Sequence, residues 1–97
     1  MRAFWSYMRY DEPWAMGTEL ALSELPVGTA GVVETLQLPD AMQHHLMHMG
    51  FVPEARVVVI RRAPAGDPTV YSIDGFEIAL RRETAKSIVV RATTEEL

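Results

Sequence analysis

Cysteine is absent from the 97-residue chain, and its absence excludes disulfides, thiolate metal sites and cysteine nucleophiles. Long apolar runs are missing too, since the longest uninterrupted aliphatic run, Val57 to Ile60, is far too short to cross a membrane. No continuous apolar stretch follows the first arginine, so a secretory signal is not expected. These absences predict a cytoplasmic protein that is not embedded in a membrane.

Basic charge is scarce, with nine basic residues against thirteen acidic ones and a formal net charge of −4. Most of the basic residues lie in the second half of the chain, where Arg61-Arg62 and Arg81-Arg82 form two pairs. Nucleic-acid binding needs a clustered basic face that neutralises phosphates. We therefore expect no nucleic-acid partner, and only the two arginine pairs keep an RNA-associated domain as an alternative.

The composition is that of one small globular domain, with 48% hydrophobic and 23% charged residues. Residues 1–21 hold five of the eight aromatic residues without a regular period, which predicts an N-terminal arm that either docks on the domain or is disordered. Translation starting at Met16 is an alternative for this region. Residues 22–91 are predicted to form the folded domain, and residues 92–97 a C-terminal tail.

Short β-branched and alternating segments predict strands over residues 29–36, 55–63, 69–73, 76–80 and 87–91. Asp74-Gly75 between the third and fourth of these is a strong signal for a two-residue hairpin turn. Single helical turns are expected within residues 22–28 and 82–86. Five strands with one helix inserted after the first predict a mostly-β fold, a small and strongly bent antiparallel barrel.

The inserted helix is the best-specified element. It is expected to begin at Asp40, which with Gln43 fits a capping box. Gly50 supplies the left-handed residue that ends the helix, and Phe51 can fold back onto its last turn. Spacing of i, i+4 and i+7 predicts a buried stripe made of Met42, Leu46 and Met49.

Enzymatic machinery does not assemble from these residues. All three histidines fall on the predicted helix, and no serine lies in a nucleophile elbow. No glycine-rich phosphate or dinucleotide loop is present in the sequence. We therefore do not expect an enzyme.

The histidines are the one group with metal chemistry in reach. His44 and His48 are four residues apart and share a helix face, where two imidazoles can bind zinc, ferrous iron or another divalent transition metal. A closed site needs about four ligands, so the others must come from an acid on a neighbouring loop or from another copy of the protein. The alternative interpretation is a solvated polar helix face with one histidine at its boundary.

Two features predict a partner-binding surface. The arginine pairs fit an anionic contact, although edge charges also simply block association between sheets. A stiff loop with two prolines suits docking, although it also merely connects two strands. The predicted contact residues are Arg61, Arg62, Pro64, Gly66, Asp67 and Pro68.

An ordered set of segments resembles the FeoA family from about Leu22 to Val90. The resemblance is carried by Leu22-Ser23-Glu24-Leu25-Pro26-Val27-Gly28 with Gly31, Leu46-Met47-His48-Met49-Gly50-Phe51-Val52-Pro53, Val58-Val59-Ile60-Arg61-Arg62-Ala63-Pro64 with Gly66-Asp67-Pro68, and Asp74-Gly75-Phe76-Glu77-Ile78-Ala79-Leu80-Arg81 followed by Ala85 and Ile88-Val89-Val90.

This resemblance implies an SH3-like β-barrel and a small cytoplasmic accessory of ferrous iron transport, without catalysis of its own. Its implied partner is FeoB, a GTP-binding permease, at the inner face of the membrane. The same module forms the C-terminal domain of DtxR-type repressors, so a metal-responsive regulatory module that senses iron through His44 and His48 is an alternative. Both a monomer and a weak homo-oligomer are compatible with the sequence.

Two positions depart from the family pattern. Glu54 stands where the family usually has a glycine after Phe-x-Pro, so we expect the turn before the second strand to be built differently. His44-His45-Leu46 stands where the family usually has Arg-Leu, which removes a basic contact and adds the histidine cluster.

Overall fold

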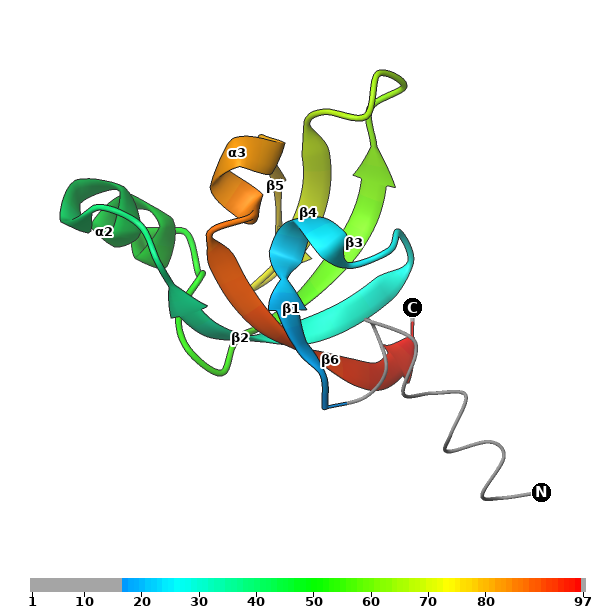
Figure 1. Cartoon of the computed structure of the whole chain (residues 1–97), viewed down its shortest axis with the longest axis horizontal. Coiled ribbons are helices and arrows are strands. Elements are labelled where there is room, and N and C mark those ends of the chain that lie inside the picture. Colours follow the sequence, from blue (N-terminus) through cyan, green and yellow to red (C-terminus); the bar gives the residue numbers. More distant parts are fainter. Residues whose placement is uncertain (1–16, 97) are drawn as a thin grey trace.

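The computed structural model describes residues 17–96, with side-chain burial and contacts for residues 17–93. Within that range the chain runs through strands, one longer helix and two short helical turns, coloured in order in Figure 1. The elements are β1 (Glu19–Ala21), η1 (Leu22–Glu24), β2 (Thr29–Leu36), α2 (Asp40–His48), β3 (Arg56–Arg62), β4 (Thr69–Ile73), β5 (Phe76–Leu80), α3 (Arg82–Ala85) and β6 (Ile88–Glu96).

The strands form one six-stranded sheet in the order β1-β6-β2-β3-β4-β5, and every neighbouring pair is antiparallel. Register shifts interrupt the pairing of β2 with β6 twice, and that of β3 with β4 once, between Val59 and Arg61. Such bulges bend a strand and increase its twist. The sheet accordingly curls strongly while α2 projects from one side of it (Figure 1).

The sheet is open, so the prediction of a closed barrel is wrong, whereas the mostly-β fold with one inserted helix is confirmed. Its edges β1 and β5 do not pair with each other within residues 17–96. Instead η1, which follows β1, contacts α3, which follows β5. Leu22 and Leu25 at η1 and Ala85 on α3 are fully buried. Side-chain packing therefore covers this end of the core in place of a strand pairing.

Both ends of the folded domain extend beyond the predicted limits. Part of the expected arm forms β1, and the backbones of Gly17 and Thr18 exchange hydrogen bonds with Ala92 at 2.9 Å each. Most of the expected tail continues β6, because Ala92 is buried in line with Val90 and the strand stays paired with β2. The rest of the predicted arm, residues 1–16, lies outside the described residues.

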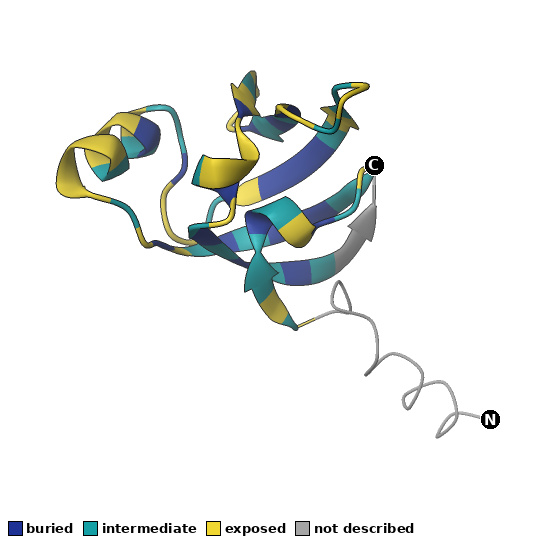
Figure 2. Cartoon of the chain, turned by 45° about the horizontal axis from the view of Figure 1, so that its top comes forward, coloured by how far each residue is buried: buried dark blue, intermediate teal, exposed yellow. Residues whose placement is uncertain are grey.

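Buried residues follow the middle strands of the curled sheet, as the dark blue segments in Figure 2 show. Strand β4 and the described part of β6 bury alternate residues, as a half-buried sheet requires, whereas β3 buries Val57, Val58 and Val59 in a row. The fully buried larger side chains are those of Leu22, Leu25, Val33, Phe51, Val57, Val59, Tyr71, Ile73, Ile88 and Val90. No helix within residues 17–96 is long and apolar enough to span a membrane.

The inserted helix is rotated relative to the prediction. Leu46 is buried and Met49 packs against the core as expected, but Met42 is 43% exposed and Met47 packs in its place. The predicted capping box is also wrong, because the Gln43 amide instead donates to backbone carbonyls before the helix, at 2.7 and 3.3 Å. This attachment turns Gln43, Leu46 and Met47 toward the sheet.

Glu54 itself adopts the left-handed backbone conformation, with φ = 76°. We had expected the turn to be built differently from a glycine turn. That prediction is wrong, because the turn keeps the left-handed geometry with a side chain present. Hydrogen bonds between this turn and Val33 of β2, at 2.7 and 2.8 Å, hold the conformation in place. A residue with a Cβ atom pays about 1–2 kcal/mol for this conformation.

We therefore expect Glu54→Gly to raise the free energy of unfolding by about 1 kcal/mol, because glycine adopts this φ without strain. Urea denaturation of the purified protein measures the change. Glu54→Ala is the matched control, since it removes the carboxylate, including its 3.8 Å contact with Arg91, but retains the Cβ atom. An equal gain in the glycine and alanine variants would contradict the explanation.

Among the described residues, Tyr71 is the largest fully buried side chain. Burial raises the pKa of its phenol above the ordinary value of 10.0, while a hydrogen bond with Thr69 and the charge of Arg62 act in the opposite direction. The folded protein therefore holds the phenol proton more tightly than the unfolded chain does. Its contribution to stability is complete below pH 10 and is lost as the pH rises through the folded-state pKa.

Tyr71→Phe should be less stable than the parent at pH 8, by about 1 kcal/mol, because it loses the hydroxyl's hydrogen bond. The difference should shrink as the pH rises above 10, since phenylalanine does not ionise. Urea denaturation of both proteins at several pH values between 8 and 11 measures this difference. If the two stability curves stay parallel over that range, the assignment to Tyr71 is wrong.

Candidate functional site

Helix α2 carries all three histidines on its outer side. Residues three and four apart on a helix lie on one face, so His44 and His48 are neighbours and His45 lies beside them. All three are exposed, as is Ala41 one turn earlier. The structure thus brings the predicted metal residues together on a free surface of the molecule.

The position of this helix is set by its C-terminal end. Gly50, with φ = 110°, donates its N–H to Met47 at 3.1 Å, and Phe51 donates to Leu46 at 3.0 Å. These two bonds are the Schellman arrangement that ends many helices. The predicted roles of Gly50 and Phe51 are therefore confirmed, and Phe51 is completely buried.

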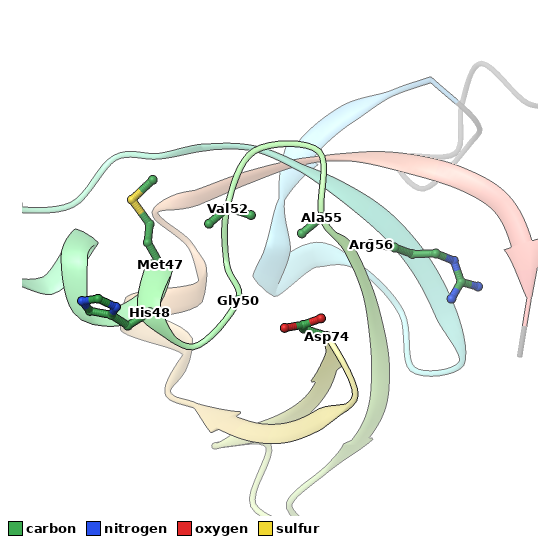
Figure 3. A pocket seen from close by; sticks show the side chains of 7 residues that line it. All are labelled: Met47, His48, Gly50, Val52, Ala55, Arg56 and Asp74. Atoms are coloured by element: carbon green, nitrogen blue, oxygen red, sulfur yellow. The ribbon is translucent and has the colours of Figure 1, made fainter.

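A pocket of about 470 Å³ lies between the end of α2 and the β4–β5 turn (Figure 3). Its lining consists of Met47, His48, Gly50, Val52, Ala55, Arg56 and Asp74. Figure 3 shows Asp74 and Arg56 on one side, with the ring of His48 at the far side and directed away from Asp74. The two ionisable ends are therefore separated by an apolar middle.

A complete metal site is not found among the residues that the structure describes. Among the described residues, no three or more histidine and carboxylate side chains gather closely enough to hold a metal ion. The expected acid from a neighbouring loop is thus not found in this part of the chain. His44 and His48 remain two ligands of a set that needs about four.

The loop between β3 and β4 is compact and projects from the sheet (Figure 1). The Ala63 carbonyl accepts a bond from the N–H of Gly66 at 2.7 Å, and the Ala63 N–H donates to the carbonyl of Pro68 at 3.0 Å. The Asp67 carboxylate accepts a bond from the backbone N–H of Arg82 at 2.9 Å, which joins the loop to the start of α3. Pro64, Asp67 and Pro68 are exposed, so the loop presents a fixed shape to solvent.

Arg61 and Arg62 play different parts, because neighbours on a strand point to opposite faces. Arg61 is 62% exposed and forms an ion pair with Glu77 at 3.4 Å. Arg62 points inward, donating to the Thr69 hydroxyl at 2.9 Å and to the Leu25 carbonyl at 3.3 Å. Of the two, only Arg61 offers its charge at the surface.

The second arginine pair lies close to this loop, as expected from the topology. Arg62 pairs with Thr69 across β3 and β4, and Thr69 pairs with Leu80, which immediately precedes Arg81. Arg81 and Arg82 are both exposed. The β3–β4 loop is well separated from α2 in both Figure 1 and Figure 2.

Two further features did not emerge from the sequence pattern. Phe76 lies on β5 in register with the buried Ile73, yet it is 64% exposed, because β5 is an edge strand and nothing follows it in the sheet. Arg91 of β6 forms an ion pair with Glu34 of β2 and also approaches Glu54. The spacing of apolar residues predicts to which face of a helix or strand a side chain points. It does not predict whether another part of the domain packs on that face.

Known proteins share this fold and much of this sequence. Residues 20–92 match the family model of the FeoA domain. A segment of 71 residues is 34% identical to a fusion of Fe(2+) transport protein A with the Fe(2+) transporter FeoB from Porphyromonas gingivalis, and it covers 73% of this chain. The chain spans only about 8% of that much longer fusion protein.

Solved structures agree with the family model. The FeoA protein of Chlorobium tepidum superposes with a TM-score of 0.72 and 33% identity, over 79% of this chain and 74% of that one. FeoA of Stenotrophomonas maltophilia, described as an SH3 domain protein in complex with zinc, gives 0.65 and 36%, over 73% and 88%. The SH3-like description thus holds for a relative of this open sheet.

A manganese-dependent transcriptional repressor also superposes, with a TM-score of 0.68 over 76% of this chain and 41% of the repressor. Its identity of 20% shows a shared fold alone. The family match, in contrast, covers most of the chain and includes the loop, α2 and the pocket. On these grounds the chain belongs to the FeoA domain family.

Proposed function

We propose that this protein is a non-enzymatic accessory of ferrous iron transport that binds a FeoB-type permease at the cytoplasmic face of the membrane. The observation that carries the proposal is the fusion relative, in which segments named for FeoA and FeoB belong to one polypeptide. Two domains that act together tolerate such a fusion, because the linker only raises their effective concentration.

The β3–β4 loop is the contact surface that we propose for the permease. Its backbone bonds and its bond to α3 fix it before binding, so little conformational entropy is lost on docking. Arg61, Arg81 and Arg82 surround it with exposed positive charge, although the chain as a whole is acidic. This distribution suits an acidic patch on the partner.

Arg62 is left out of the proposed contact, although the sequence placed it there. Its guanidinium is engaged by Thr69 and by the Leu25 carbonyl inside the domain. Changing it would disturb the packing of η1 on β3 and β4, and a loss of binding would then report on folding. Substitution of Arg61 therefore tests the surface charge separately from folding.

Arg61→Glu should weaken binding to the purified permease by about tenfold while leaving thermal unfolding nearly unchanged, because it reverses one exposed charge at the loop. Biolayer interferometry with a FeoB-type permease of the same host, held in detergent micelles, measures the affinity. Arg56→Glu, the same change at the other end of β3, is the control and should bind as the parent does.

Two outcomes contradict different parts of the account. Equal affinities for Arg61→Glu, Arg56→Glu and the parent would remove the loop as the contact surface. No binding of the parent protein to the permease, with the permease shown to hydrolyse GTP, would contradict the proposed function itself.

A further inference from the structure

Strand β5 is one of the two edges of the sheet formed by residues 17–96. The turn before it, Asp74-Gly75, has positive φ at both residues, 50° and 82°, which is the two-residue turn of a hairpin. Backbone bonds between Ile73 and Phe76 close such a turn, and bonded and non-bonded pairs then alternate along β4 and β5.

This alternation turns the backbones of Glu77 and Ala79 away from β4. Their N–H and C=O groups point to the free edge, and within residues 17–96 no backbone bond joins either residue to an element other than β4. Both residues are exposed. An edge with free donors and acceptors is a template for an added strand.

The core face of the sheet is also incompletely covered at this edge. Residues directly opposite each other on paired strands share a face, so Phe76 lies on the side of the buried Ile73, and Ile78 on that of the buried Tyr71. Phe76 is nevertheless 64% exposed, and Ile78 is half-buried. A strand added beside β5 would therefore remove apolar surface from water while it pairs the backbone.

We propose that the β5 strands of two copies pair antiparallel about a two-fold axis, which joins the two sheets into one. Full overlap of the five residues places Ile78 beside Ile78 of the second copy, on the axis, and Phe76 beside the second copy's Leu80. All of these side chains lie on the core face. The backbone groups of Glu77 and Ala79 bond across the axis in this register.

The charges along β5 suit a second copy. Glu77 lies opposite Ala79 of the second copy, so no two like charges are directly opposed. Arg81 continues the strand in extended backbone, is exposed, and lies diagonal to the second copy's Glu77, within reach of that long side chain. The two Glu77 carboxylates form the other diagonal pair, and each has Arg61 of its own chain at 3.4 Å. The inference does not rest on the proposed function.

Sedimentation equilibrium of the full chain tests the proposal, with a chelator present so that no metal ion joins two copies. The mass should rise from 10.9 kDa toward twice that value between about 10 μM and about 1 mM protein, because one short strand makes a small and weak contact. Over the same range, hydrogen exchange at the amides of Glu77 and Ala79 should slow severalfold. A monomer at every concentration, or exchange that does not depend on concentration, would contradict the pairing.

Glu77→Arg and Arg81→Glu test the register. Each variant alone brings like charges together across the axis, so each should stay monomeric over this range. An equimolar mixture of the two should dimerise, because each chain then meets opposite charges on its partner. If the mixture stays monomeric although both variants are folded by circular dichroism, the pairing of β5 strands is wrong.

Phe76→Thr should weaken the dimer about tenfold, because it removes an exposed ring from each chain but keeps a residue that favours strands. Met42→Thr is the matched control, since it removes an exposed apolar side chain from α2 instead, and it should dimerise as the parent does. Equal effects of the two substitutions would remove β5 as the interface.

Discussion

The reversal of the chain at Gly50 is the constraint on which the functional side of the molecule depends. It buries Leu46 and Phe51 against the sheet, and full burial of such side chains contributes about 1.5–3 kcal/mol each. Leu46 is the one buried residue of α2, so this end attaches the helix to the domain. Gly50 also lies so close to the β4–β5 turn that a Cβ atom there would approach that of Asp74 at 3.1 Å. This junction, together with the Gln43 bonds that rotate the helix, positions the histidine face and the pocket.

Much of the fold could be predicted from the sequence, because its signals are local. The limits of β2, β4 and β5, the Asp74-Gly75 turn and the end of α2 follow from β-branched runs and from residues that favour positive φ. Closure of the barrel could not be predicted, since it depends on whether η1 and α3 fill the gap between two edges. Neither could β1, whose three residues carry too little pattern and form a strand only because β6 pairs with them.

The candidate site was predicted in part. Spacing alone places His44 and His48 on one face, but which face is exposed depends on tertiary contacts, and the Gln43 bonds that rotate the helix have no counterpart in the hydrophobic pattern. Strict alternation from the buried Val57 and Val59 would place Arg61 inward, but the register shift after Val59 turns Arg62 inward instead. The exposure of Phe76 follows only from its place on an edge strand. The left-handed conformation of Glu54 could not be predicted from its residue type either. Backbone hydrogen bonds between this turn and β2 hold that conformation.

The β3–β4 loop, which we propose as the surface for a protein partner, and the histidine-bearing face of α2 are separate surfaces on one small domain. That the protein serves ferrous iron transport is the central claim of the proposed function. It is tested most directly by uptake of labelled ferrous iron in the native host, with this gene deleted and then restored. The account predicts that uptake falls on deletion and recovers with the full chain. Unchanged uptake on deletion, in a host where loss of the FeoB-type permease abolishes it, would contradict the account.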